Sequence, residues 1–432
     1  MKCIALRSGP TSSFEMPSSA VAVSPGGLLS AFANVPDPRR RQGTRFALSA
    51  ILALAVVAIL CKHLSVLAIA EWGASQCRDL LQDLGFADGV TPRQSTLQRL
   101  FRRLDADALS QALTTYFARA TSGSMAAESG TKPRLRGSEG VSIDGKAQRG
   151  RLAFDSAGCP VHALAAFVHD RGIVLAQEPI DASPQTPANA STDSTDRPTA
   201  GKAEAELSVA PSLIRRVDWQ GRVLTGDALF CQRSLCNLVV GFGGDYLLVV
   251  KENQPTLYED IRLLFDPPPG IAVPLSDRRE VETIDNGHGR HHDTRRLIAS
   301  TDLTTYSDWP HLAQVFRLER TWEEKGRAKC EVRYGITSLP SMIAGPDRLL
   351  ALKRGHWQIE NCVHYVKDVT LEEDRSPIHL GNGPSVLAIL RDLALNILHQ
   401  AGFRAIASRL RYNSSHPGAA LALLLAASDQ NA

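Results

Sequence analysis

The first part of the chain carries apolar residues at helical spacing. The stretch Phe46–Ala70 is predicted to be a buried helix, because its most apolar part, Phe46–Cys61, is shorter than the roughly 20 residues that a bilayer needs. In Gln94–Leu104 the apolar residues recur at i, i+3, i+4 and i+7, which is typical of an amphipathic helix. Asp105 or Asp107 can cap a further helix that runs to Arg119. We expect a helical domain over residues 28–120, after a flexible tail at residues 1–27.

Beyond residue 140 the pattern changes to short β-rich runs that alternate with helical segments, which predicts an α/β fold. A linker rich in Ser, Gly, Lys and Arg covers residues 121–140. Residues 267–340 favour strands, whereas Ser183–Ala200 is rich in Pro, Thr, Ser and Ala and is expected to be a disordered loop. The other expected strands are 141–144, 162–168, 172–177, 222–225 and 246–250. One helix is expected to run through Leu213, and three more are expected at 256–265, 346–366 and 385–399.

Composition and charge narrow the classes of function. The 432 residues are 44% hydrophobic, which excludes a chain that is disordered as a whole and allows two or three domains. The formal net charge is only +3, but basic residues gather in separate groups that suit a phosphate backbone. Solvated surface charge explains any one group equally well. No secretory signal or membrane span is expected, and we predict a cytoplasmic protein. The basic groups are Arg39, Arg40, Arg41 and Arg45; Arg93, Arg99, Arg102 and Arg103; and Lys132, Arg134, Arg136, Lys146, Arg149 and Arg151.

Three acids are the candidates for a metal site. Asp144 and Asp227 come at the ends of short β-rich runs, and Glu360 lies on the predicted helix that begins at Pro346. They are 83 and 133 residues apart (227 − 144 and 360 − 227), so only the fold can bring them together. Carboxylate oxygens suit Mg²⁺, and two such ions about 3.5–4 Å apart can activate an attacking oxygen and stabilise a leaving one at phosphorus. On spacing alone, most Asp residues at strand ends are turn formers or caps.

The segments around these acids resemble the motifs of a known family. Ser142–Gly150 (SIDGKAQRG), Thr225–Gln232 (TGDALFCQ) and Arg354–Tyr365 (RGHWQIENCVHY) resemble, in order, the three catalytic motifs of the ISAs-type, H-repeat-associated insertion-sequence transposases. Tyr246–Gln254 and other segments also match, and the resemblance covers roughly Leu28–His399. A single short motif is weak evidence, but these motifs occur in the family's order.

The resemblance implies a ribonuclease-H-like catalytic core with a DDE triad of Asp144, Asp227 and Glu360. The expected fold class is α/β, with this core over residues 141–400, a mostly β insertion at about 267–340, the helical accessory domain before it and a C-terminal tail at 401–432. The implied activity is Mg²⁺-dependent phosphoryl transfer with two ions, for which Mn²⁺ is the alternative. The implied partner is double-stranded DNA, both the terminal inverted repeats of the element and its target, bound by a homodimer.

Basic side chains near the acids are the candidates for DNA contacts. Lys146 and Arg149 follow the first acid directly and are assigned to phosphate. Lys367 lies about two turns beyond Glu360 and is a further candidate, although a solvated lysine explains it almost equally well. His356 and His364 are expected to bond to nearby carboxylates or to phosphate. Recognition of the element's ends is assigned to the helical domain, through Arg99, Arg102 and Arg103.

Other interpretations of the same residues stay open. His356, Glu360 and His364 recur at i, i+4 and i+8 on one helix face, a spacing that a zinc site can use, although no H-E-x-x-H pattern is present. Trp322 lies in a polar run of the insertion and can stack on a displaced base or pack a turn. Two alternative functions keep the same fold: a catalytically silent DNA-binding remnant of a transposase, and a nuclease that does not transpose.

Overall fold

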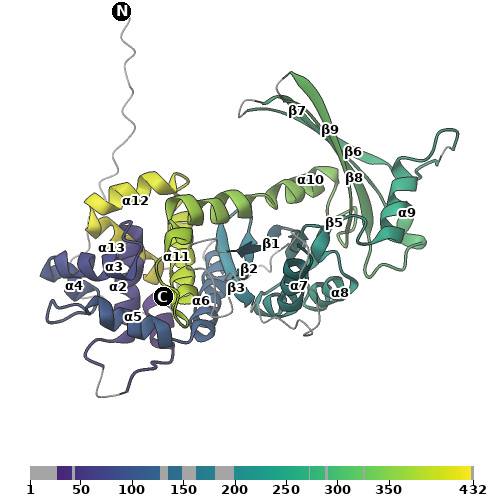
Figure 1. Cartoon of the computed structure of the whole chain (residues 1–432). Coiled ribbons are helices and arrows are strands. Elements are labelled where there is room, and N and C mark those ends of the chain that lie inside the picture. Colours follow the sequence, from purple (N-terminus) through teal and green to yellow (C-terminus); the bar gives the residue numbers. More distant parts are fainter. Residues whose placement is uncertain are drawn as a thin grey trace, which may run out of the picture.

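The computed structural model describes residues 27–40, 44–126, 135–147, 162–180, 199–271, 273–287, 290–324 and 326–429. The expected tail at 1–27 and the expected loop at 183–200 lie almost wholly outside these ranges, as does Arg149. Within them, no helix has the length and apolar character to cross a membrane. A helical domain lies at one end of the molecule, a central sheet follows, and a strand-rich extension projects at the other end (Figure 1).

The predicted helical domain begins with six helices. The expected single helix over Phe46–Ala70 is instead two, because Lys62 adopts a left-handed backbone (φ 67°) and Ser65 caps the second helix by accepting from the Ala68 N–H at 3.1 Å. Asp105 caps the last helix by accepting from the Ala108 N–H at 2.9 Å. This helix extends into the predicted linker. The six are α1 (Leu28–Ala33), α2 (Leu48–Leu60), α3 (Val66–Ser75), α4 (Arg78–Asp83), α5 (Gln94–Arg103) and α6 (Ala106–Ala126).

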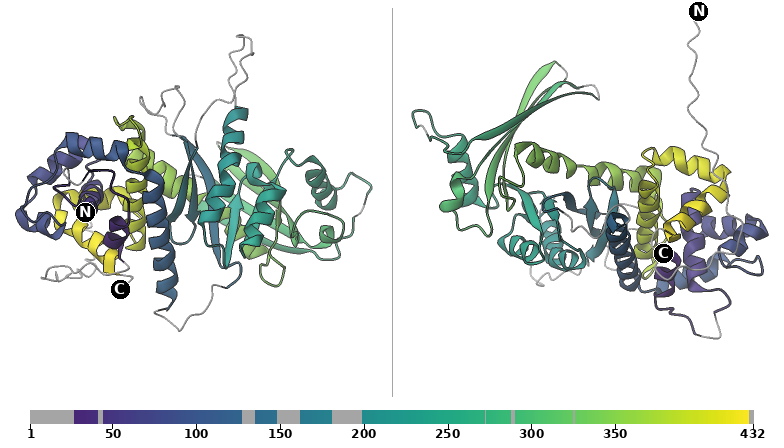
Figure 2. Two further views of the ribbon diagram at one scale, coloured as in Figure 1. Left: turned by 90° about the horizontal axis from the view of Figure 1, so that it is seen from below. Right: turned by 180° about the vertical axis from the view of Figure 1, so that it is seen from behind.

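Helix α2 must be covered on every side, because all of its residues except Ser49 are buried. α1 and α3 cover part of it, and α11 (Gly383–Gln400), α12 (Ile406–Ser415) and α13 (Pro417–Asp429) cover the rest. The expected C-terminal tail at 401–432 is therefore wrong: most of it forms two helices that pack on the helical domain. Both views of Figure 2 show the helices from the two ends of the chain side by side.

A nine-stranded mixed sheet forms the centre, in the order β3-β2-β1-β4-β5-β9-β8-β7-β6. β1, β2 and β3 are antiparallel neighbours, and β4 and β5 run parallel to β1. This arrangement of the first five strands is the ribonuclease-H-like topology, and it confirms the expected fold class. The five strands are β1 (Glu139–Ala147), β2 (His162–Val168), β3 (Ile173–Ile180), β4 (Arg222–Gly226) and β5 (Asp245–Val250).

Alternation along β1 sends its side chains to two differently packed faces. Val141 and Ile143 belong to the core shared with α7 (Thr199–Arg216) and α8 (Arg233–Gly241). Ser142 and Asp144 face the opposite side, covered by the helix that begins as α10 (Pro346–Gly355). Further along, this helix contains two π-helical turns, Glu360–His364 and Val366–Thr370. Such turns are rare and are frequent at functional sites.

The strand-rich extension is inserted between Asp227 and Glu360, where the β insertion was expected. It is reached through α9 (Pro255–Phe265) and consists of β6 (Arg279–Gly287), β7 (Arg290–Ser300), β8 (Gln314–Glu324) and β9 (Arg327–Thr337). Each of these strands is antiparallel to the next, and β9 pairs with β5.

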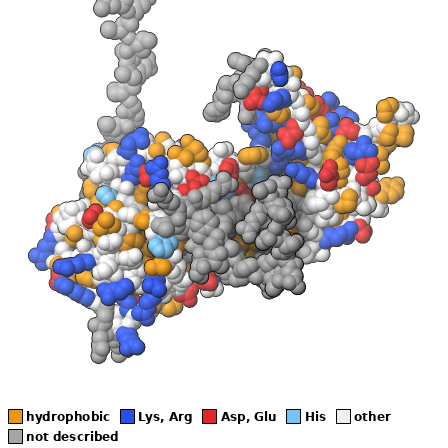
Figure 3. Space-filling view, in the orientation of Figure 1, with side chains coloured by type: hydrophobic (Ala, Val, Ile, Leu, Met, Phe, Trp, Pro, Cys, Tyr) orange, Lys and Arg blue, Asp and Glu red, His pale blue; other side chains and the backbone are white. Residues whose placement is uncertain are grey.

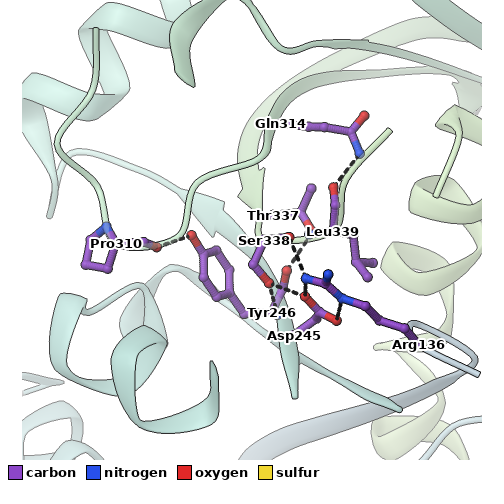
Figure 4. Close-up of polar contacts among 8 residues, drawn as sticks. All are labelled: Arg136, Asp245, Tyr246, Pro310, Gln314, Thr337, Ser338 and Leu339. Atoms are coloured by element: carbon purple, nitrogen blue, oxygen red, sulfur yellow. Dashed lines mark hydrogen bonds and ion pairs between the residues drawn. The ribbon is translucent and has the colours of Figure 1, made fainter. Parts of the chain in front are cut away.

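Polar contacts fix the base of the insertion to the core (Figure 4). Asp245, at the start of β5, accepts hydrogen bonds from Arg136 at 2.8 and 2.9 Å and from the Ser338 hydroxyl at 2.8 Å. The Thr337 hydroxyl donates to the Tyr246 carbonyl at 2.7 Å. The insertion is therefore anchored to the same sheet that carries the first two acids.

Candidate functional site

Asp144 and Asp227 lie at the same level of neighbouring strands. Ser142 in β1 pairs with Thr225 in β4 in parallel register, and each acid comes two residues further along. Strand alternation therefore directs both acids to the side of α10. Asp144 lies inside β1 rather than at its end, because β1 continues to Ala147. Asp227 follows β4 and caps a short 3-10 turn by accepting from the Leu229 N–H at 3.0 Å.

Glu360 meets Asp144 beside His364. The Nδ1 atom of His364 lies 3.1 Å from Glu360 Oε2 and 3.5 Å from Asp144 Oδ2. One potential ligand atom from each of these three residues lies within 4.8 Å of the other two. The structure thus brings the first and third acids together. It also gives His364 the carboxylate partners expected from the sequence.

Burial, and to a smaller extent neighbouring carboxylates, shift the pKa values of the site. Burial raises the pKa of Asp144 to about 7, and the charges of Asp227, Glu206 and Glu360 contribute to the rise, while the Gly145 N–H opposes it. Burial lowers the pKa of His364 to about 4, so that its imidazole is neutral at neutral pH. Carboxylates that repel one another around a neutral imidazole fit a divalent cation, which would relieve the repulsion.

Glu206, on α7, is a fourth acid near the site that sequence reasoning missed. It packs so closely against β1 that a Cβ added to Gly145 would lie 2.3 Å from Glu206 Oε1. The available signal was Gly145 itself, because a glycine inside a strand marks a close approach of another group.

His356 does not join the other two residues of the alternative zinc site. Its Nδ1 lies 3.4 Å from the hydroxyl of Thr225, which is two residues before Asp227, and burial lowers the pKa of His356 to about 3. His356, Glu360 and His364 therefore do not converge, and only one histidine accompanies the acids in the described residues. A neutral, inward-facing imidazole is also poorly placed for the phosphate contact expected of His356.

Lys367 is buried, contrary to the expectation that it contacts DNA. It is 3% exposed, and its Nζ lies 3.0 Å from Asp392 and 3.4 Å from Glu373. Burial alone would lower the pKa of Lys367, but the two carboxylates raise it above its ordinary value. Lys146 is nearer to the acids and forms an ion pair with Asp368 on the second π-helical turn.

A basic cleft borders the acids on the side of the insertion. This insertion cleft of about 450 Å³ holds five cationic side chains and one carboxylate, and Trp357, which is 55% exposed, lies at its edge. Sequence reasoning missed this cleft. Leu318 and Arg320 are two residues apart in β8, as Glu331 and Arg333 are in β9, so each pair lies on one face of its strand. The lining is Arg295, Leu318, Arg320, Glu331, Arg333, Lys353, Arg354, Trp357 and Asn361. Trp322 lies nearby on β8, in a strand rather than a turn, with the Arg320 guanidinium 4.8 Å from its ring centre.

A second basic cleft, of about 640 Å³, lies in the helical domain. Arg99 and Arg103 from α5 line this arginine cleft, and Arg102 is exposed on the same helix. Figure 3 shows Lys and Arg side chains gathered on the helical domain and on the inner side of the insertion. The arginines of this cleft are Arg39, Arg40, Arg45, Arg93, Arg99 and Arg103.

Comparison with known families gives two matches that together cover most of the fold. The family described as "DDE_Tnp_1-associated" matches residues 29–117, which is the helical domain. The family described as "Transposase DDE domain" matches residues 197–397, from α7 to α11, a range that contains Asp227 and Glu360.

Similar curated proteins come from bacteria. An "Uncharacterized protein in dhlA 3'region" of Xanthobacter autotrophicus is 29% identical over 71% of this chain and 92% of its own length. "Putative transposase YncI" of Escherichia coli O157:H7 is 26% identical over 86% of this chain and 87% of its own. "H repeat-associated putative transposase YhhI" of Escherichia coli K12 is 25% identical over 60% of this chain and 63% of its own.

Among solved structures, a piggyBac transposase synaptic complex with hairpin DNA is similar at a TM-score of 0.37 and 11% sequence identity. The match covers 91% of this chain and 78% of that chain.

Proposed function

Because the chain belongs to the DDE transposase family, we propose that it is an insertion-sequence transposase that cleaves double-stranded DNA at the terminal inverted repeats of its element and joins the ends to target DNA. The observation that carries the proposal is the meeting of Asp144 and Glu360, 216 residues apart (360 − 144), beside Asp227 on the neighbouring strand. Together with Asp227, which follows β4, Asp144 and Glu360 would supply the oxygen ligands that phosphoryl transfer on DNA requires.

Asp144, Asp227 and Glu360 would hold the divalent ions, for which we propose two Mg²⁺ with Mn²⁺ as the alternative. When bound, such ions activate the attacking oxygen and stabilise the leaving oxygen at phosphorus. His364 orients the third ligand, because its ring contacts the Glu360 carboxylate from one helical turn away. Asp144 must lose its proton to act as a ligand, so its raised pKa means that ligation near neutral pH releases a proton.

The two basic clefts supply the proposed DNA surfaces. The insertion cleft is lined by Trp357 and Asn361, on either side of Glu360 in the sequence. Its arginines form ion pairs with acidic residues of the insertion and would exchange these partners for phosphates close to the reacting bond. The arginine cleft lies in the helical domain, which supports the assignment of end recognition to that domain. Because an element has two ends, we expect a homodimer in the DNA complex, acting in the cytoplasm that holds the element's DNA.

A cleavage and joining assay with the element's own ends tests the proposal. We expect Mg²⁺- or Mn²⁺-dependent strand cleavage followed by joining to a target duplex, and loss of both in Asp144→Asn. Binding of the ends without any cleavage would support the alternative of a silent remnant. Cleavage without joining would support a nuclease with the same core.

A further inference from the structure

Four polar residues from four separate segments meet in the interior of the protein, next to the three acids along their strands and helix. His169, just after β2, places its Nε2 2.7 Å from the Ser142 hydroxyl of β1 and 3.0 Å from the Thr225 hydroxyl of β4. The Ser142 hydroxyl also donates to the His356 carbonyl at 3.2 Å, and Thr225 contacts the His356 ring at 3.4 Å. Ser142, Thr225 and His169 are at most 3% exposed. We call these four residues the histidine hub.

Three members of the hub stand one structural repeat away from an acid. Ser142 precedes Asp144 by two residues in β1, and Thr225, in β4, precedes Asp227 by two residues, with Asp227 directly after the strand. Two residues is the period of a strand, so each pair shares a face of the sheet. His356 precedes Glu360 by four residues, which is about one turn of the helix. His169 bridges the strands of the first two acids, and its two hydroxyl partners reach the helix of the third.

Two glycines show how tightly the His169 ring is held. A Cβ added to Gly140 of β1 would lie 2.3 Å from His169 Nδ1, and one added to Gly355 of α10 would lie 2.2 Å from the same atom. The imidazole is therefore wedged between the sheet and the helix, and its thickness sets how closely α10 approaches β1. The backbone N–H of His169 also donates to the Gly140 carbonyl at 3.0 Å, which fixes the start of the turn between β2 and β3.

We propose that His169 is a positioning residue of the metal site, which holds the strands of Asp144 and Asp227 and the helix of Glu360 at the separation that the ions require. The inference rests on the proposed function, because it assumes that these acids are the metal ligands. A buried histidine that served only to satisfy core hydrogen bonds would affect stability alone. Loss of a positioning residue also weakens metal binding, as loss of groups that hold metal ligands in place commonly does.

The test compares His169→Leu, which removes the polar ring at similar volume, with His169→Gln, which keeps a polar atom near the position of Nε2. Mn²⁺ affinity is measured by calorimetry on the full chain without DNA, and half-maximal Mg²⁺ for cleavage is measured separately. We expect His169→Leu to weaken Mn²⁺ binding by about 10-fold or more, within the range of about 10–100-fold seen for supporting groups. His169→Gln should recover most of that loss.

Trp219→Phe is the matched control for lost stability. Trp219 is fully buried and its indole N–H donates to the Ile214 carbonyl at 2.8 Å, just before β4 and so at the end of that strand opposite to Asp227. It should lower the unfolding midpoint without changing Mn²⁺ affinity. If His169→Leu does not fold, Thr225→Val removes one hub hydroxyl at almost constant volume and should weaken Mn²⁺ binding in the same direction.

Mn²⁺ affinity within twofold of wild type in the folded His169→Leu or Thr225→Val variant would overturn the positioning role. So would an equal loss of affinity in Trp219→Phe, since the effect would then follow stability. Failure of the proposed function looks different: wild type would show no metal-dependent cleavage, or Asp144→Asn would bind Mn²⁺ as tightly as wild type.

Discussion

Replacing Lys367 by methionine removes one ammonium group from a network of four buried charges. Its Nζ lies 3.0 Å from Asp392 Oδ1 and 3.4 Å from Glu373 Oε1, and Arg391 lies 3.8 Å from the same Glu373 oxygen. Two cations balance two carboxylates, and none of the four side chains is more than 7% exposed. The substitution keeps most of the side-chain volume but leaves one carboxylate in the core without a counter-charge.

Removing one partner of a buried ion pair costs about 3–5 kcal/mol. We expect the free energy of unfolding of Lys367→Met to fall by about that amount, measured by guanidinium unfolding without DNA. The salt dependence of binding to element ends should stay unchanged. If Lys367 instead contacted phosphate, stability without DNA would be unchanged and the slope of log affinity against log salt would fall by about one unit. That second pattern would refute the buried network.

The pH dependence of the same variant gives an internal control. Burial already raises the pKa of Asp392 to about 6 with Lys367 present. A carboxyl group whose pKa is higher in the folded state binds its proton preferentially there, so the stability lost at pH 8 should be partly regained as the pH falls toward 5. Lys367→Met combined with Asp392→Asn restores charge balance and should recover most of the loss at pH 8. No recovery would mean that the loss came from packing rather than charge.

Four further predictions concern the site and its surfaces. Asp144→Asn, Asp227→Asn and Glu360→Gln should each abolish cleavage but leave DNA binding largely intact; turnover above about a tenth of wild type would remove that residue from the site. Ca²⁺ should support DNA binding but little cleavage, because it tolerates looser geometry than Mg²⁺, and full activity in Ca²⁺ would contradict the mechanism. Replacing Arg99, Arg102 and Arg103 by Ala should lower the salt slope of DNA binding by about one unit per lost phosphate contact, and an unchanged slope would move recognition elsewhere. Gly355→Ala should lower the free energy of unfolding by about 1–3 kcal/mol, because its Cβ would overlap the His169 ring; wild-type stability in chemical unfolding would show that α10 can move away.

The local pattern of the chain was sufficient to predict the strands that carry the first two acids. Val141 and Ile143 alternate with Ser142 and Asp144, and this alternation corresponds to two faces of β1 in the structure. The order of the strands was not contained in that pattern. It followed from the motif resemblance, because periodicity describes which face a residue occupies and not which strand lies next to it.

The residues near Glu360 could not be placed by helical periodicity. Lys367 is seven residues beyond Glu360, which in a regular α-helix returns to nearly the same face. One π-helical turn begins at Glu360 and a second, Val366–Thr370, contains Lys367, so the side chains beyond Glu360 depart from the positions of a regular α-helix. The counter-charges of Lys367 could not be foreseen either, because Asp392 lies on a different helix, α11.

The C-terminal helices were missed although one signal for them was present. α2 is apolar on all faces, and a helix of this kind requires neighbours on every side. The predicted N-terminal helices were too few to surround it, so another apolar segment had to do so. The Ala- and Leu-rich stretch within residues 417–429 was the remaining candidate.

Helix α11 connects the proposed end-recognition surface with the helix that carries Glu360. α5, which carries the arginines, ends where the Arg102 and Leu104 carbonyls accept hydrogen bonds from Asn382 at the start of α11. α11 carries Asp392, which forms an ion pair with Lys367 on the helix of Glu360, and Arg391, which pairs with Glu373. Arg391 also donates to the Leu64 carbonyl at 3.1 Å, between α2 and α3. Removing residues 28–120 would therefore expose the face of α11 that packs on α2, α5 and α6 and would remove the contact between Arg391 and Leu64. We therefore expect the helical domain to support the proposed catalytic site through α11, and DNA bound in the arginine cleft would lie on elements that pack, through α11, toward the helix of Glu360.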